Sequence, residues 1–246
     1  MSLTTRSSRT PILLCDVTQY SQPCCSAFKT FGLFSSGIGV HYAESNIVDV
    51  SNQDLAKKLT IGQRLVPQVL VRAADARPEN IQELAPSDTR FKLFVFPGDI
   101  SQPAAKAALA KLAEYVGEAG SFFRKFTPSG AAKDAVFDIL TIAYVELLFI
   151  ELVAYVPVSS TTKKETVNYN DVPQALRAHW SKVWVDDEQL AGGLGGKVYE
   201  TYGIDSQVGA IVVIRPDGYV SAVAPLDGFQ HLDSYFSKFL KPVTAA

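Results

Sequence analysis

Few residues of the types that perform chemistry occur in this chain, and the cysteines are the first to consider. The 246 residues include three, Cys15, Cys24 and Cys25, all near the start. An adjacent Cys-Cys pair is not the Cys-X-X-Cys motif of a redox protein, and three cysteines do not make a disulfide framework. We therefore interpret them as small, partly buried structural thiols.

Candidate metal ligands are also sparse. Neither cysteines nor histidines recur at the spacing of a zinc site, and the three histidines are His41, His179 and His231. The acidic run Asp186-Asp187-Glu188 could bind a cation or supply paired carboxylates for acid/base chemistry. We favour an exposed acidic loop, so the sequence assigns no metal-binding residue.

The glycine-rich segments do not match nucleotide-binding motifs. Gly37-Ile38-Gly39 would need a third glycine at position 42, which is Tyr42, to make a dinucleotide fingerprint. Gly192–Gly196 lacks the following Lys-Ser/Thr of a phosphate-binding loop, and we predict a mobile loop there. The Gly-X-Ser-X-Gly nucleophile motif is absent from the sequence. We therefore predict no catalytic and no cofactor-binding residues.

A strand, a turn and an amphipathic helix lie at the centre of the predicted fold. Phe91–Phe96 is an apolar strand that ends at Pro97-Gly98-Asp99, and Ser101 is a suitable N-cap for a helix over Gln102–Gly117. Val136–Ala143 is the natural second, parallel strand, since the connection is long enough for a crossover. Together these segments predict a βαβ unit.

The C-terminal part predicts a hairpin and a closing helix. Ala210–Ile214 is an apolar run rich in β-branched residues, as in a strand buried on both faces. Pro216-Asp217-Gly218 supplies a turn, and Tyr219–Ala224 follows as the second strand. Apolar residues at helical spacing then predict a helix over Gly228–Leu240, capped by Asp227. This order is how a thioredoxin-like domain closes.

The remaining predicted elements are short. They are strands over Gln68–Arg72 and Val183–Asp187, helical turns over Asp54–Leu59 and Ile81–Leu84, helices over Tyr20–Phe34 and Val172–Trp180, and loops over Ala74–Pro78 and Ser159–Asn170. Val145–Val156 is too apolar for a free loop, but its pattern does not decide between strand and helix.

Composition limits the class of protein. Hydrophobic residues make up 47% and charged residues 20%, as in a folded protein with one large domain or one domain plus an extra segment. A net charge of −2 does not favour nucleic-acid binding. The most apolar stretch, Ile139–Val158, contains Glu146 and Glu151, so we predict no membrane span. The N-terminus lacks a secretory signal, and we expect a cytoplasmic protein.

Six segments, in this order, resemble one family. They are Phe34–Tyr42, Ile61–Arg64, Ala74–Pro78, Phe91–Ile100, Val183–Asp187 and Tyr199–Val223. The chain is similar to the C-terminal thioredoxin-like (dimerisation) domain of fungal phenol hydroxylase-like FAD-dependent aromatic monooxygenases. The resemblance extends from about residue 20 to residue 241, and the last segment is its most specific part.

The resemblance implies an α/β, thioredoxin-like fold with a central mixed sheet flanked by helices. In that family an N-terminal flavin domain carries the chemistry, and its glycine turn for FAD is not found in this sequence. We expect residues 1–60 to be an extension that resembles the end of the flavin domain, and residues 61–246 to form the thioredoxin-like domain. Thioredoxins place Cys-X-X-Cys where this chain has Pro97–Ser101, so thiol chemistry is excluded at that position.

Other polar residues receive structural interpretations. Asp75 is expected to pair with Arg64 or Arg77, which lie in the matching segments. Asp99 is expected to interact with the dipole of the following helix. Three tyrosines, Tyr199, Tyr202 and Tyr219, could line a pocket. We favour positions at the edge of the core, where the ring is buried and the hydroxyl contacts water.

Three functional hypotheses follow. The first is a non-catalytic accessory or dimerisation domain without its own cofactor, which associates with a second copy or with a flavoprotein monooxygenase. The second is a stand-alone small-molecule binder or enzyme on the same fold, with a pocket between the sheet and the Gly192–Gly196 loop. The third is an incomplete gene model, or fragment, of a full FAD-dependent aromatic hydroxylase.

Overall fold

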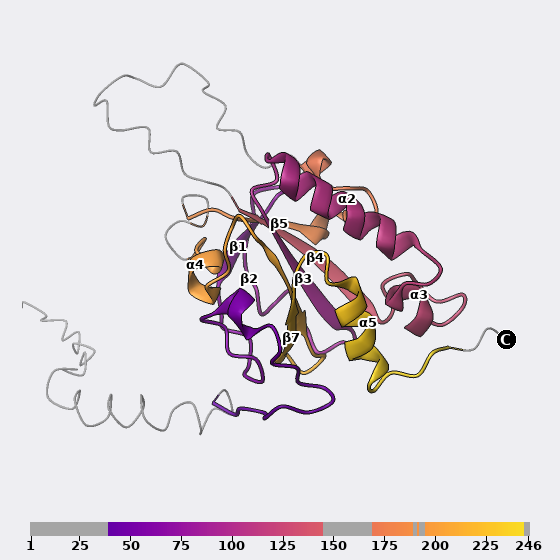
Figure 1. Ribbon diagram of the computed structural model, residues 1–246. Coiled ribbons are helices and arrows are strands. Elements are labelled where there is room, and N and C mark those ends of the chain that lie inside the picture. The colour runs from indigo at the N-terminus through magenta and orange to yellow at the C-terminus, as the bar shows by residue number, and fades with distance from the viewer. Residues whose placement is uncertain (1–38, 145–168, 189–190, 192–194, 244–246) are drawn as a thin grey trace, which may run out of the picture. The chain divides into compact units, whose positions relative to one another are not determined.

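The structure is a computed structural model that describes residues 39–144, 169–188, 191 and 195–243 (Figure 1). The chain divides into two compact units, residues 1–40 and residues 41–246, and the fold described here is that of the second unit. Its elements are η1 (Gln53–Ala56), β1 (Val69–Arg72), β2 (Pro78–Asn80), β3 (Phe91–Gly98), α2 (Pro103–Gly117), α3 (Phe122–Phe126), β4 (Phe137–Tyr144), η2 (Tyr169–Asp171), η3 (Trp180–Lys182), β5 (Val183–Asp186), α4 (Val198–Tyr202), β6 (Ala210–Ile214), β7 (Val220–Ala224) and α5 (Phe229–Ser237), where η marks a 3-10 helix.

A mixed sheet of seven strands, in the order β2-β1-β5-β4-β3-β6-β7, is the centre of the unit. The three middle strands, β5, β4 and β3, run parallel to one another. The outer pairs, β1 with β5, β1 with β2, β3 with β6 and β6 with β7, are antiparallel. The parallel strands therefore end together at one side of the sheet, where α/β proteins commonly place ligand sites.

Both faces of the sheet are buried, because side chains alternate between faces along each strand. On β3, Phe94 and Phe96 lie in the core shared with α4 and η1, whereas Leu93 and Val95 lie in the core shared with α2, α3 and α5. Figure 1 shows α2, α3 and α5 on one side of the sheet and α4 on the other. This arrangement explains why β6 is apolar throughout and why β3, apart from Lys92, is apolar on both faces rather than alternating.

The two longer helices cover the sheet with regular apolar stripes. In α2, Ala105, Leu109 and Leu112 are buried at helical spacing, and Pro103 begins the helix at a position that needs no backbone donor. In α5 the buried residues are Leu232, Tyr235 and Phe236. Phe236 lies 4.8 Å, centroid to centroid, from Phe137 of β4, so the last helix is fixed to the parallel part of the sheet.

Neither edge of the described sheet presents a long free strand. The β2 edge is three residues long, begins with Pro78 and carries Glu79. Residues 49–65 run along the β7 edge and donate backbone hydrogen bonds to it. The donors and acceptors are Leu65 to Gly218, Gly62 to Val220 and Asp49 to Ser221. Short, proline-containing or covered edges resist pairing with other chains.

The predicted α/β fold, with its βαβ unit, hairpin and final helix, is confirmed. The strands predicted over Phe91–Phe96 and Val136–Ala143 correspond to β3 and β4, with parallel register from Phe91 opposite Phe137. The predicted hairpin corresponds to β6 and β7, and Gly218 in its turn has a φ of 83°. Strands over Gln68–Arg72 and Val183–Asp187 are also present as β1 and β5.

The helix predicted over Val172–Trp180 is wrong. Leu176 and Arg177 donate to the Pro173 carbonyl in one isolated turn. His179 then adopts an extended backbone, and its side chain accepts a hydrogen bond from the Ser181 backbone as the cap of η3. A local side-chain bond of this kind competes with helix continuation.

Two predicted helix caps are also wrong, and five short elements were missed. The residue before α2 is Gln102 rather than Ser101, and the residue before α5 is Gly228 rather than Asp227. The missed elements are β2, α3, α4, η2 and η3. Each has three to five residues, too few to show a hydrophobic period.

Some predictions lie outside the described residues. These are the helix over Tyr20–Phe34, the segment Val145–Val156, most of the loop over Ser159–Asn170 and all three cysteines. The proposed boundary at residue 60 stays a prediction. Among the helices that the structure describes, none has the length and apolar character needed to cross a bilayer.

Candidate functional site

The ends of the three parallel strands bring together four residues, which we call the strand-end cluster: Gly98, Asp99, Asp186 and Tyr199. Gly98 is the last residue of β3, and Asp186 is the last residue of β5. Tyr199 reaches them from the first turn of α4. This is the side of a parallel sheet where a ligand site is expected, so the bonding of each polar group decides whether such a site is open.

The Tyr199 hydroxyl joins two of the parallel strands. It donates to the Ile142 carbonyl of β4 over 2.7 Å and accepts from the Gly98 backbone of β3 over 2.9 Å. Burial raises the pKa of Tyr199 well above its ordinary value. The hydroxyl is therefore protonated at neutral pH and acts as a structural bridge.

Asp186 is a buried carboxylate that holds the start of α4. It accepts hydrogen bonds from the backbone N–H groups of Val198 (2.8 Å) and Tyr199 (3.1 Å), donors that the helix itself cannot use. Burial raises the pKa of Asp186 to about 6, although these two hydrogen bonds act in the opposite direction. Its carboxylate oxygens face the helix start.

Gly98 and Asp99 lie at the end of β3, in the short connection that leads to α2. Gly98 has a φ of 81°, and a Cβ there would lie 1.9 Å from the Ser206 carbonyl oxygen. Asp99 accepts hydrogen bonds from the Ser101 backbone (2.9 Å) and from the Ser101 hydroxyl (2.8 Å). Burial acts to raise the pKa of Asp99, but these bonds and one from Gln102 lower it. Ser101 thus donates hydrogen bonds to Asp99 and does not cap α2.

The exposed acidic loop predicted at Asp186-Asp187-Glu188 is wrong for its first two residues. Asp186 and Asp187 are each only 3% exposed. Glu188 is exposed and pairs with Lys197 over 2.9 Å. The capping role of Asp186 has no sequence signal, because its helix starts 12 residues later. Among the described residues, no group of three potential ligands could hold a metal ion.

Gly195 and Gly196, predicted to lie in a mobile loop, contact the sheet. The Gly196 backbone donates to the Val69 carbonyl of β1 over 2.9 Å. With a φ of 77°, a Cβ on Gly196 would lie 2.3 Å from the Asp187 backbone. The remaining glycines of this loop, Gly192 and Gly193, lie outside the described residues.

The ion pair expected between Asp75 and Arg64 or Arg77 has a different partner. Asp75 forms two bonds with Arg72, of 2.8 and 2.7 Å, and the Arg72 side chain lowers the pKa of Asp75 to about 2. Arg72 also stacks on the ring of Trp180 at 4.0 Å. Arg64 instead donates to the Asp217 carbonyl.

The three tyrosines are more buried than the core-edge positions predicted for them. Tyr202 is fully buried and donates to the Val66 carbonyl over 2.5 Å. Tyr219 is 8% exposed and packs edge-to-face on Tyr42 at 5.0 Å. Tyr199 lies in the strand-end cluster. None of the three tyrosines lines the pocket described below.

A second polar cluster, which sequence analysis missed, lies at the opposite ends of β3 and β4. It contains the cations Arg90, Lys92 and Lys182 and the carboxylates Asp88, Asp134 and Asp138, which we call the charge network. The Lys92 side chain is only 1% exposed and bonds to Asp88 over 2.7 Å. Burial acts to raise the pKa of Asp88, but hydrogen bonds from Arg90 and Lys92 hold it well below its ordinary value.

The fold and the strand-end cluster define an α/β domain whose polar groups at the ligand-binding side bond to its own backbone. The chain belongs to the family described as phenol hydroxylase, C-terminal dimerisation domain, which it matches over residues 40–244. The family expected from the sequence is therefore confirmed.

Three relatives illustrate this membership. The chain is 35% identical to 3-hydroxybenzoate 4-monooxygenase from Comamonas testosteroni, over 87% of this chain and 32% of that protein. It is 32% identical to FAD-dependent monooxygenase terD from Aspergillus terreus, over 85% of this chain and 33% of terD. It is 32% identical to phenol 2-monooxygenase fsqG from Aspergillus fumigatus, over 82% and 32%. The chain thus spans about a third of the length of these relatives.

Proposed function

We propose that this domain is a non-catalytic, thioredoxin-like module that associates with a second copy of itself. The closed strand-end cluster is the observation that carries this proposal. At the position of a thioredoxin's reactive thiols, Gly98 and Asp99 are held by Tyr199 and Ser101, and the buried Asp186 carboxylate is used by α4. Membership in a family described as a dimerisation domain supports self-association as its role.

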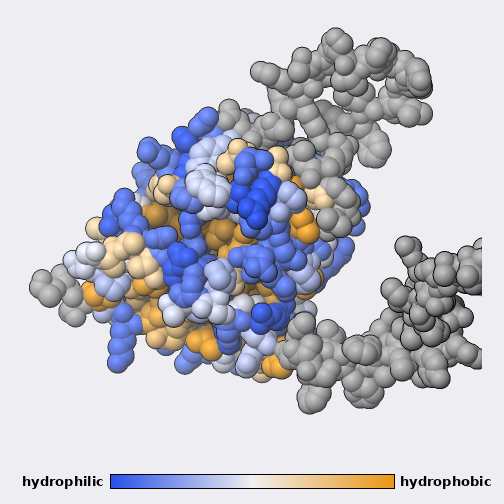
Figure 2. Space-filling view, turned by 180° about the vertical axis from the view of Figure 1, so that it is seen from behind, coloured by the Kyte–Doolittle hydropathy of each residue, from blue (hydrophilic) through white to orange (hydrophobic). Residues whose placement is uncertain are grey.

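The contact surface that we propose lies between residues 41 and 50. Of the large apolar side chains that are exposed in the described part of the second unit, three fall in this short segment: Tyr42, Ile47 and Val50, at 41%, 38% and 37%. The face shown in Figure 2 mixes hydrophobic and hydrophilic residues in small areas. A local cluster of apolar side chains is therefore a better candidate than a broad apolar face.

Sedimentation equilibrium of the chain tests self-association directly. We expect a mass of about twice 26.7 kDa. Ile47→Asp should shift the equilibrium toward the monomer, because a charge would be desolvated at the contact. Val208→Asp, at a 56% exposed site in the loop before β6, is the matched control and should leave the mass unchanged. A monomer at all concentrations contradicts the proposal.

The relatives are named as monooxygenases, and we extend that activity to this chain only as part of a larger assembly. We propose that the domain holds no FAD itself and associates, in the cytoplasm, with flavin domains of the monooxygenase class. The purified chain should be colourless and should not retain added FAD on gel filtration. A yellow preparation with stoichiometric flavin would overturn this part, and a sequenced transcript that encodes an upstream flavin domain would favour the full-length hydroxylase instead.

A further inference from the structure

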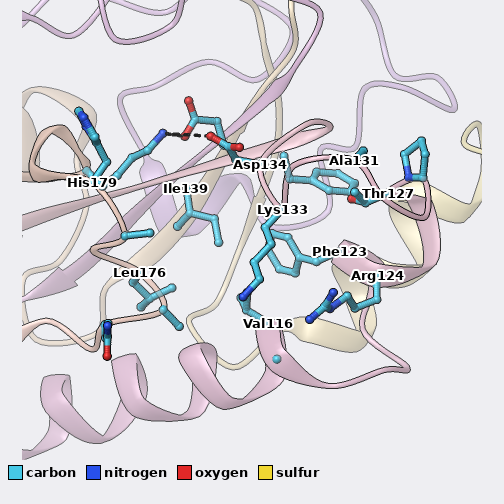
Figure 3. A pocket seen from close by; sticks show the side chains of 18 of the residues that line it. Val116, Phe123, Arg124, Thr127, Ala131, Lys133, Asp134, Ile139, Leu176 and His179 are labelled. Carbon is cyan, nitrogen blue, oxygen red and sulfur yellow. Dashed lines mark hydrogen bonds and ion pairs between the residues drawn. The ribbon is translucent and has the colours of Figure 1, made fainter.

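A pocket of about 930 Å³ lies beside the first residues of β4, at the opposite end of the strand from the strand-end cluster (Figure 3). It is formed by the end of α2, by α3 and the loop after it, and by residues 174–182. Its apolar side chains include Val116, Phe123, Phe137, Ile139 and Leu176. A concave, largely apolar site of this size is typical of small-molecule binding.

The acidic side chains that line the pocket are already neutralised. Asp138 pairs with Lys182 and lies 3.4 Å from Arg90. Asp134 lies 3.1 Å from Arg90. With Lys92 and Asp88, the charge network holds three cations and three carboxylates, so it adds no net charge to the site. A cationic ligand would find no free carboxylate here.

Two further cations line the pocket without a counter-ion. Arg124 and Lys133 are exposed, and neither forms an ion pair within the part of the chain that the structure describes. In Figure 3 both side chains extend toward the same end of the pocket, near Val116. The buried Thr127 hydroxyl, which also lines the pocket, has no hydrogen-bond partner there. The lining therefore combines an apolar floor, two free positive charges and an unused hydroxyl.

We propose that this pocket binds a small amphipathic organic anion, with an apolar body on the floor and a carboxylate at Arg124 and Lys133. Charge-assisted hydrogen bonds from arginine and lysine are the strongest contacts available to a carboxylate. His179, Gln174 and Ser129 add further polar groups to the lining. This inference is independent of self-association, since it uses none of residues 41–50.

Octanoate and octan-1-ol are suitable probes, because they share an apolar chain and differ in charge. We expect octanoate to shift the backbone NMR signals of pocket residues in a saturable titration. Octan-1-ol should bind about tenfold more weakly, since it cannot form charge-assisted bonds. Acetate, which lacks the apolar body, should cause no saturable change.

A double substitution tests the two cations. Arg124→Gln with Lys133→Gln should weaken octanoate binding about tenfold and leave octan-1-ol binding unchanged. Lys57→Gln with Lys58→Gln removes the same charge from exposed sites beside η1 and is the matched control. Signal dispersion of each variant verifies folding. Absence of pocket shifts up to the solubility limit of octanoate, equal binding of acid and alcohol, or equal loss in the control variant would overturn the proposal.

Discussion

The two ends of the parallel strands differ in how their polar groups are used. At the strand-end cluster, Tyr199 and Asp186 are buried and bond to backbone groups of the domain itself. At the other end, the charge network is internally balanced, but Arg124 and Lys133 face the pocket without an ion-pair partner among the residues that the structure describes. Ligand sites in α/β folds usually occupy the first of these ends. Here the usual end supports stability, and the capacity to bind lies at the other end.

The largest expected effect is that of Gly98→Ala at the strand-end cluster. A Cβ would lie 1.9 Å from the Ser206 carbonyl oxygen, and the φ of 81° disfavours any residue but glycine. Strain and overpacking together should lower the free energy of unfolding by about 4 kcal/mol. Urea denaturation measures this loss. Ala substituted at Gly130, which has open space around its own positive φ, is the control and should cost about 1 kcal/mol.

Asp186→Asn should change how stability depends on pH. The pKa of Asp186 is raised to about 6 in the folded state, so its contribution is complete below the unfolded value near 4 and is lost as pH rises through 6. That loss amounts to about 3 kcal/mol. The variant should lack this decline between pH 4 and 6. Urea denaturation at several pH values measures the free energy of unfolding of both proteins. If it depended on pH in the same way in both, the assignment of a buried carboxylate with a raised pKa would be contradicted.

Tyr199→Phe isolates the hydroxyl that joins β3 and β4. The substitution keeps the ring but leaves the buried Gly98 N–H and the Ile142 carbonyl without this partner. We expect a loss of about 2 kcal/mol in the free energy of unfolding. Thermal and urea unfolding provide the measurement. Tyr115→Phe is the matched control, because the Tyr115 hydroxyl accepts a longer bond, 3.3 Å, from the Phe122 backbone, and it should cost less than Tyr199→Phe.

The smallest stability effect is expected at the pocket. Arg124→Gln with Lys133→Gln should change the free energy of unfolding by less than about 0.5 kcal/mol, because both side chains are exposed and unpaired. The same variant should bind octanoate about tenfold more weakly. If it were as destabilised as Tyr199→Phe, the contrast between a structural end and a binding end would fail.

The parts of the fold that sequence predicts well are those with long, regular patterns. β3 and β6 are nearly continuous apolar runs, and α2 has apolar residues at helical spacing. The residues Pro-Asp-Gly favour a turn by their own backbone preferences. The strand-end cluster depends instead on distant pairings. Asp186 caps a helix that begins 12 residues later. In the charge network, Lys92 of β3 is buried beside Asp138 of β4, which is distant in the sequence. No local pattern identifies such partners.

The closed edges of the sheet limit how large an assembly of this domain can grow. A free edge strand would let each added copy extend the hydrogen bonding and expose a new edge, which leads to open filaments. Here β2 is short and begins with Pro78, and residues 49–65 occupy carbonyls along β7. The self-association proposed above would therefore use side chains, and a self-complementary contact across a twofold axis is complete after two subunits.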